Sequence, residues 1–146
     1  MKIHQLSLFL ENKPGRLVEP CRALADAGIN ILTLSLADTQ QFGILRLIVK
    51  DWQKGKQVLE KAGFVVNTTE VVATEVADRP GGLANILEII EDGGVNIEYM
   101  YAFTFRNEDR AVLVFRFNNP DNAIELLRSK GINVVGSVEL YERAEK

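Results

Sequence analysis

One short polar motif that suits a charged small molecule occurs twice in the chain. Asn12-Lys-Pro-Gly-Arg-Leu17 reappears as Asp78-Arg-Pro-Gly-Gly-Leu83, each time just before an apolar segment typical of a helix. Gly15 and Gly81 follow proline at the expected helix start, where free backbone N–H groups and the positive end of the helix dipole attract a carboxylate. The residues that open the two copies, Asn12 and Asp78, add side-chain oxygens that accept from an ammonium group.

A second polar feature follows each expected helix. Gly28-Ile-Asn-Ile31 recurs as Gly94-Val-Asn-Ile97, so that an asparagine, Asn30 or Asn96, leads into the next apolar segment. An asparagine both donates and accepts, which suits a ligand that carries a carboxylate beside an ammonium. We expect this asparagine and the preceding loop to fall close together, in a pocket shared by the two copies. Taken singly, each residue is also explained as a helix cap or a tight turn.

The residues available for catalysis or metal binding are few. The chain has one histidine, His4, and one cysteine, Cys21, so a nitrogen and sulfur metal site is excluded. Cys21 corresponds to Leu87 of the other copy, which favours a small buried hydrophobic residue over a nucleophile. The acidic residues have no spacing that specifies a general acid and base. The sequence therefore predicts no catalytic residue, no metal, no cofactor and no enzymatic activity.

The two motifs belong to an internal repeat whose copies are 66 residues apart. After a longer loop in the second copy, corresponding residues are 68 apart. The residue pattern of each copy predicts six elements in the order strand, helix, strand, strand, helix, strand. In the first copy the strands are residues 3–10, 29–37, 44–49 and 64–68, and the second helix is residues 52–62. The first helix carries Leu17, Cys21 and Leu24 on its apolar face, which Leu83, Ile86, Leu87 and Ile90 mark in the second copy. Gly28 and Gly94 stand where the glycine that ends this helix is expected. In the second copy the later elements are residues 95–105, 111–117, 120–130 and 133–141. Pro20 predicts a kink or an irregular first turn in its helix.

This order of elements predicts an α+β fold, with two ferredoxin-like βαββαβ units whose helices cover one face of an antiparallel sheet. The expected boundaries are residues 1–70 and 71–146. A unit of about 70 residues buries a thin core and leaves sheet edges unpaired. We therefore expect the two copies to pair and the chain to form a homodimer.

The charge and composition of the chain argue against several classes of binding partner. The 146 residues carry a formal charge of −3, without a basic run at either end, which argues against nucleic acid and anionic membranes as partners. No apolar stretch is long enough to span a bilayer. A single cysteine and a start without a signal-peptide pattern predict a cytoplasmic protein.

The repeated motifs together resemble the ACT domain, a small ligand-binding module of amino-acid metabolism. The resemblance covers nearly the whole chain in tandem and implies a free amino acid bound between two ACT units. It implies that backbone N–H groups of one loop bind the ligand carboxylate, either those of Gly15, Arg16 and Leu17 or those of Gly81, Gly82 and Leu83. It also implies that Asn30, Ile31, Asn96 and Ile97 face the ligand across the interface. Asp78, being charged, should hold the ammonium better than Asn12.

The resemblance predicts a non-catalytic sensor, or the allosteric subunit of a separate enzyme of amino-acid metabolism. No catalytic domain is expected in the chain. A regulatory subunit that binds its partner without a small-molecule ligand of its own is the alternative. An RNA-binding ferredoxin-like protein is a weaker alternative, because the chain is acidic and lacks stacking aromatics in its first copy.

Overall fold

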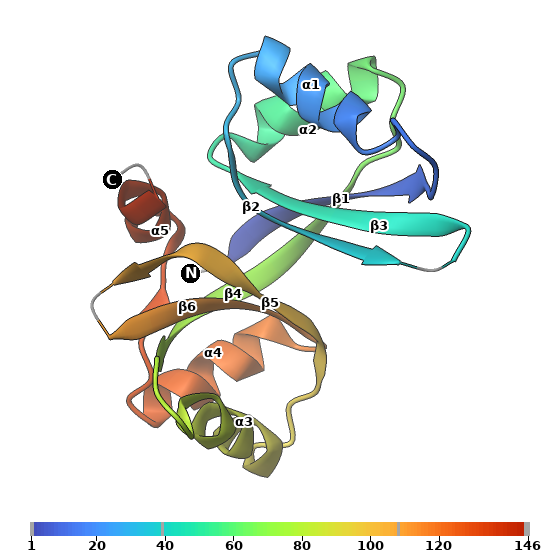
Figure 1. The fold of residues 1–146 in the computed structure, drawn as a ribbon. Helices are drawn as coiled ribbons and strands as arrows, with labels where there is room; N and C mark the ends of the chain where they lie inside the picture. Colours follow the sequence, from blue (N-terminus) through green and yellow to red (C-terminus); the bar gives the residue numbers. More distant parts are fainter. Residues whose placement is uncertain (1, 39, 108, 145–146) are drawn as a thin grey trace. The chain divides into compact units, whose positions relative to one another are not determined.

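The computed structural model describes residues 2–38, 40–107 and 109–144, except for the side chains of residues 104–107, and it shows an α+β chain. It divides into two compact units: His4–Thr69 forms the first, and the chain from Glu70 on, with the first three residues, forms the second (Figure 1). The elements in these ranges are β1 (Ile3–Glu11), α1 (Val18–Asp26), β2 (Ile31–Asp38), β3 (Phe42–Val49), α2 (Trp52–Lys61), β4 (Asn67–Ala77), α3 (Gly82–Asp92), β5 (Ile97–Asn107), β6 (Arg110–Phe117), α4 (Pro120–Ser129), β7 (Val134–Val135) and α5 (Ser137–Ala144).

The first unit has the ferredoxin-like strand order β2-β3-β1-β4, with α1 and α2 together on one side of the sheet (Figure 1). Both β1 and β2 pair with β3 in antiparallel register, with Leu8 and Leu36 each opposite Leu45. Alternate residues of the central strands therefore point to the helices and form the core: Leu6, Leu8, Leu10, Leu24, Leu45, Leu47, Val49, Leu59 and Val66.

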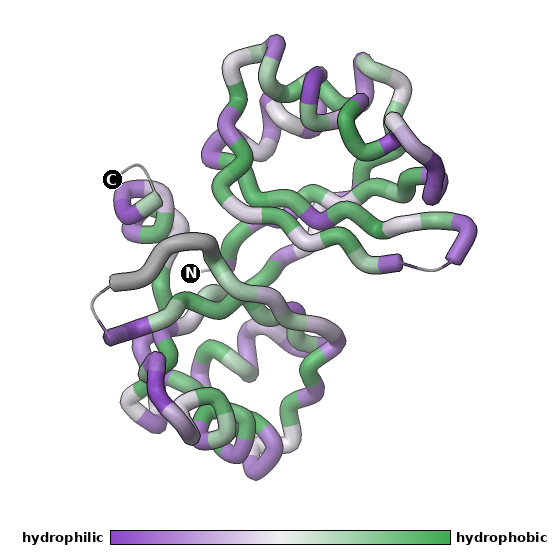
Figure 2. Tube along the Cα trace, in the orientation of Figure 1, coloured by the Kyte–Doolittle hydropathy of each residue, from purple (hydrophilic) through white to green (hydrophobic). Residues whose placement is uncertain are grey.

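The second unit repeats this arrangement, with β4 in the place of β1. Its strands β4, β6 and β5 are neighbours in that order, and the short β7 pairs with β4. In Figure 2 the strands are mostly hydrophobic, whereas the helices alternate between hydrophobic and hydrophilic residues. The buried residues of α3, α4 and the sheet form this unit's core: Val72, Val76, Ile86, Ile90, Phe115, Phe117, Ala123, Leu127 and Val134.

Two predicted strands differ most from the structure. The last strand of the first copy begins at Asn67, three residues later than predicted, and runs on to Ala77, through the joint between the copies. In the second copy the predicted strand over residues 133–141 is wrong: two residues form β7, and Ser137–Ala144 form α5. In this helix Leu140 is fully buried and Arg143 forms an ion pair with Glu75 on β4 at 2.6 Å, so packing selects a helix.

Pro20 explains why the first helix starts late. α1 begins at Val18, whereas α3 begins at Gly82, which corresponds to residue 16. Pro20 is thereby placed in the first turn, where no intrahelical N–H bond is required of it. It is buried with Leu24, at the positions that Ile86 and Ile90 occupy in α3.

Two expectations about the helix faces are wrong in the same way. Cys21 is only partly buried, because the core side of α1 is formed by Pro20 and Leu24. Leu17 and Leu83, predicted on that apolar side, are 40% and 42% exposed. The repeated loop therefore presents a leucine to its surroundings in both copies.

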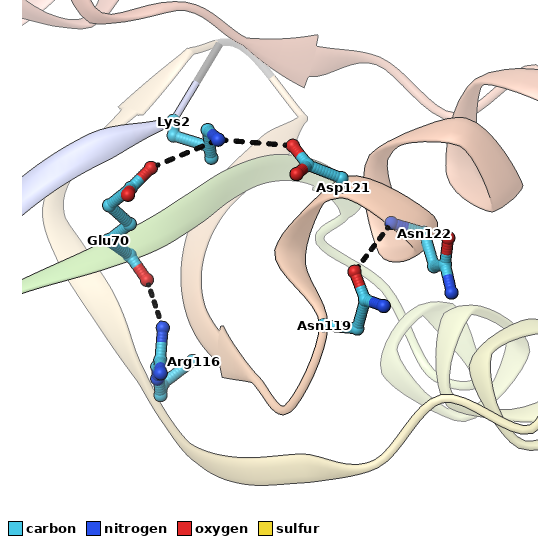
Figure 3. Close-up of polar contacts among 6 residues, drawn as sticks. All are labelled: Lys2, Glu70, Arg116, Asn119, Asp121 and Asn122. Atoms are coloured by element: carbon cyan, nitrogen blue, oxygen red, sulfur yellow. Dashed lines mark hydrogen bonds and ion pairs between the residues drawn. The ribbon is translucent and has the colours of Figure 1, made fainter.

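An ion-pair network within the second unit ties its helix layer to the start of β4. Lys2 Nζ lies 3.2 Å from Glu70 Oε2 and 3.1 Å from Asp121 Oδ1 in the first turn of α4 (Figure 3). The Glu70 carbonyl accepts from Arg116 Nη1 at 2.9 Å. Hydrogen bonds to Asp121 and Glu70, and then their charges, raise the pKa of Lys2.

This network predicts a stability change at alkaline pH. Because the folded-state pKa of Lys2 is raised, its contribution is fully present below the unfolded lysine pKa of about 10.4 and is lost as pH rises through the folded value. The urea midpoints of the wild type and Lys2→Met should differ at pH 8 and converge as the pH rises above about 10.4. A difference that stays constant up to pH 11.5 would contradict an ionic contribution.

Candidate functional site

The two repeated loops have the same backbone geometry. Gly15 and Gly81 have φ angles of +87° and +86°, a left-handed conformation that favours glycine. In each loop a turn follows the strand, with the Arg16 N–H donating to the Lys13 carbonyl at 3.3 Å and the Gly82 N–H donating to the Arg79 carbonyl at 3.0 Å. These two N–H groups are thus already engaged in turns. The binding of a ligand carboxylate by the N–H groups of these loops stays a prediction, and Arg16 and Gly82 would have to share or give up their turn hydrogen bonds for it.

Gly82 is required by a close approach of the backbone. A Cβ atom there would lie 2.0 Å from the carbonyl oxygen of Ala77. The first copy has Arg16 at this position, where the helix has not yet begun. The difference between the copies at this position is thus explained by where each helix starts.

Neither loop uses its first residue as a helix cap, because the N-caps of α1 and α3 are Leu17 and Gly81, without side-chain hydrogen bonds. Asn12 instead forms hydrogen bonds to the turn between β2 and β3. Its Nδ2 donates to the Gln40 carbonyl at 2.8 Å, and its backbone N–H donates to the Gln41 carbonyl at 2.9 Å. Asn12 therefore joins the loop before α1 to the β2–β3 turn.

A small pocket of about 90 Å³ lies at this junction in the first unit. Leucine side chains from β1, β2 and the loop form its apolar wall, and charged side chains of both signs border it. The lining residues are Leu10, Glu11, Asn12, Lys13, Leu17, Leu36, Asp38 and Gly43. Two of the predicted site residues, Asn12 and Leu17, are thus brought together.

The charges at the pocket are unequally compensated. Lys13 Nζ lies 3.0 Å from Glu11 Oε2, and Arg16 Nε lies 4.0 Å from Glu11 Oε1. The hydrogen bond and charge of Lys13, followed by the charge of Arg16, lower the pKa of Glu11 and keep it ionised. Within the described residues, by contrast, Asp38 forms no ion pair.

Asp38 is held in place by neutral donors. Its Oδ1 accepts from the Gln40 backbone N–H at 2.6 Å and lies 3.5 Å from Asn12 Nδ2. Gln40 has a φ of +72°, so this turn is bent sharply at Gln40. The arrangement fixes a carboxylate at the pocket edge without neutralising its charge.

The two predicted groups of site residues do not meet within one unit. Asn30 and Ile31 lie where β2 begins, opposite Val49. The loop that ends at Leu17 follows β1 at the other end of the sheet, where Asp38 is opposite Gly43. Seven residues of strand correspond to roughly 23 Å. The expectation that the loop and the asparagine of one copy fall close together is therefore wrong, because β2 runs the full length of the sheet between them.

The asparagine of the second unit borders a shallow groove. Asn96 and Ile97 line it together with Leu87, Ile90, Glu91, Gly94 and Val95. The backbone of Asn96 is held by Asn118: the Asn96 N–H donates to Asn118 Oδ1, and the Asn118 N–H donates to the Asn96 carbonyl, each at 3.1 Å. The second copy thus fixes the backbone of Asn96 and leaves its side chain exposed.

The family model for the ACT domain pair matches residues 1–144. The chain belongs to the ACT domain pair family. A comparison with curated proteins finds no match.

Solved structures share the fold of this ACT domain pair. Protein BT0572 from Bacteroides thetaiotaomicron is 42% identical, with a TM-score of 0.90 over 97% of this chain and 96% of that one. The regulatory subunits of aspartate kinase from Thermus thermophilus and Thermus flavus are 17% and 18% identical, with TM-scores of 0.63 and 0.62. They cover 86% and 88% of this chain, and 91% and 93% of their own chains are matched.

The sequence did not identify the charged residues at the pocket of the ACT pair as site residues. Glu11 directly precedes the motif, Lys13 is its second residue, and Asp38 ends β2 beside the turn. The motif spacing gave no signal for Asp38, because the turn that brings it to the loop is 26 residues from Asn12. The antiparallel pairing of two predicted strands was the available signal, since it places the end of β2 next to the end of β1.

Within residues 2–38, 40–107 and 109–144, no group of three His, Cys, Asp or Glu side chains is placed to hold a metal ion. His4 stacks on Trp52 with ring centroids 4.3 Å apart. None of the helices described is both long and apolar enough to cross a membrane.

Proposed function

We propose that this ACT domain pair is a non-catalytic regulatory protein that binds a free amino acid at the pocket of its first unit. One observation carries the proposal: a small pocket combines an apolar leucine wall with a lysine, a paired carboxylate and a carboxylate that forms no ion pair with any residue that the structure describes. A free amino acid has three matching parts, namely an ammonium, a carboxylate and a side chain.

Each part of the ligand has a partner. Asp38 is the acceptor for the ammonium, because it is oriented by Gln40 and Asn12 without an opposing charge. Lys13 is the donor for the carboxylate, exchanging its exposed pair with Glu11 for the ligand. Leu17 and Leu36 contact the side chain. Asn30, Ile31, Asn96 and Ile97 stay predicted ligand contacts outside this pocket.

The regulatory part of the proposal rests on family and fold. The chain is an ACT domain pair, and regulatory subunits of aspartate kinase share its fold. A ligand that binds one conformation more tightly shifts the population toward it, and a coupling of about 1–3 kcal/mol gives a useful switch. The partner that would respond is a separate enzyme of amino-acid metabolism.

The test is a thermal-shift panel of the purified protein against the twenty amino acids at millimolar concentration. A ligand at 100 times its dissociation constant stabilises by about 2.7 kcal/mol, so one or a few related amino acids should raise the melting temperature. Calorimetric titration then gives the stoichiometry. A flat panel with a flat titration would contradict ligand binding and favour the alternative, a subunit that acts through its partner alone.

A further inference from the structure

Gly43 is a glycine inside a strand, at a position where the backbone does not require one. It is the second residue of β3, and its φ lies outside the left-handed region that favours glycine. It pairs in regular register with Leu10 of β1 and with Asp38 of β2, so it marks no β-bulge. A Cβ atom there would lie 3.5 Å from the Ala37 carbonyl oxygen, the nearest backbone atom, which is an ordinary contact. Because a glycine inside a strand costs stability relative to alanine, its presence calls for another explanation.

The second copy has a side chain at the corresponding position. Ala111 of β6 corresponds to Gly43. It pairs with Val76 of β4, which corresponds to Leu10 of β1, so the cross-strand neighbours of the two positions match. The glycine of the first copy is therefore explained neither by its backbone conformation nor by the sheet that the two copies have in common.

The missing side chain leaves space in the pocket of the first unit. Gly43 lies in one row across the sheet with Leu10 and Asp38, and all three line the pocket. Directly opposite residues of antiparallel strands project from the same face, so a side chain at Gly43 would stand between these two. The atom nearest to such a Cβ is Leu36 Cδ1, at 3.1 Å, and Leu36 also lines the pocket. The glycine thus keeps open the space that these side chains surround.

The wall of this space suits an apolar group. The polar side chains at its edge already have partners: Asn12 Nδ2 donates to the Gln40 carbonyl at 2.8 Å. Glu11 Oε2 lies 3.0 Å from Lys13 Nζ. With Asp38 and Lys13 taken by the ammonium and the carboxylate of the ligand, the leucine wall remains for its side chain. An acidic side chain would be repelled by the carboxylates of Glu11 and Asp38.

The volume of the pocket limits the size of that side chain. The pocket measures about 90 Å³. A water molecule occupies about 30 Å³ in the liquid, so the pocket holds about three atoms of that size. A methyl group would leave most of the space empty, and an aromatic ring would exceed it.

We propose that Gly43 makes this pocket selective for a neutral amino acid with a branched aliphatic side chain of three or four carbon atoms, as in valine, leucine and isoleucine. The inference rests on the proposed function, because it names the class of ligand bound at that same pocket. A branched side chain is the compact form of this size, and it contacts the leucine wall and the backbone of β3 at Gly43 together. The glycine is therefore a specificity-determining residue.

Calorimetric titration of the full chain with single amino acids tests the proposal. The tightest of valine, leucine and isoleucine should bind about tenfold or more tightly than alanine, phenylalanine, lysine or glutamate, because even one methylene in an apolar pocket changes affinity by about tenfold. In Gly43→Ala the ratio of this affinity to the affinity for alanine should fall about tenfold, since the added methyl group takes the space of one carbon atom. Without ligand, Gly43→Ala should unfold at the same or a slightly higher urea concentration than the wild type.

Gly136→Ala is the matched control, because a Cβ there would meet nothing within 4 Å and the residue does not line the pocket. Its affinities should stay close to those of the wild type. A wild type that binds amino acids but prefers a charged, polar or aromatic one would overturn the selectivity and leave the proposed function standing. An unchanged preference in Gly43→Ala, or its unfolding at a much lower urea concentration, would overturn the role of Gly43. A wild type that binds no amino acid would contradict the proposed function and this inference with it.

Discussion

Replacing Gly82 with alanine should destabilise the protein by about 3 kcal/mol, since the added methyl group overlaps backbone rather than a movable side chain. The new Cβ would lie 2.0 Å from the Ala77 carbonyl oxygen and 3.0 Å from its carbon. In an ordinary helix the same change stabilises, because alanine loses less conformational entropy than glycine. A loss of stability, in place of the usual gain, would therefore show that the backbone of Gly82 lies close to the Ala77 carbonyl.

The measurement for Gly82→Ala is urea unfolding combined with a thermal scan, in which we expect the melting temperature to fall by roughly 10 °C. Gly136→Ala is the matched control, because a Cβ there would meet nothing within 4 Å and the residue has no positive φ. Its melting temperature should change little. If Gly82→Ala were as stable as Gly136→Ala, α3 would start elsewhere than at the loop's end.

The repeat made most of the fold predictable, because its anchors mark the ends of elements. Gly28 and Gly94 have positive φ angles of +74° and +71° just after the first helix of each copy, where a helix-ending glycine was predicted. Asn30 and Asn96 immediately precede β2 and β5, as expected. The backbone preferences of glycine and proline and the polar residues at strand ends are strong enough to predict where elements begin and end without knowledge of the tertiary structure.

The errors arise where tertiary contacts outweigh local preference. The C-terminal segment has the apolar residues of a strand, but burial of Leu140 and the pairing of Arg143 with Glu75 and Glu139 support a helix. The start of α1 depends on Pro20, whose position in the first turn was predicted only as an irregularity. Both outcomes depend on contacts that strand or helix patterns do not encode.

The candidate site was also only partly predictable from the sequence. Asn12 and Leu17 were identified from the motif and do line a pocket, whereas Asp38 was not. The pocket exists because antiparallel pairing returns the end of β2 to the loop after β1. The same pairing carries Asn30 to the far end of the sheet. A sequence motif indicates candidate site residues, and strand register determines which of them lie close together.

Replacing Asp38 with asparagine should weaken amino-acid binding about 10- to 100-fold, while the fold stays intact. A hydrogen bond to a charged group contributes about 1.5–3 kcal/mol, and this variant loses the charge that pairs with the ligand ammonium. The asparagine Oδ1 still accepts from the Gln40 N–H, which lies 2.6 Å away in the wild type, so the turn is preserved. The first unit should therefore unfold at nearly the same urea concentration without ligand.

The amino acid that gives the largest shift in the thermal panel is then titrated calorimetrically into the wild type, Asp38→Asn and Asp26→Asn. Asp26 is an exposed aspartate in the last turn of α1 and does not line the pocket, so its variant removes the same charge elsewhere. Equal affinity in all three proteins would place the ligand outside this pocket. A loss confined to Asp38→Asn would identify its carboxylate as the ammonium partner, because both variants change the net charge of the chain equally.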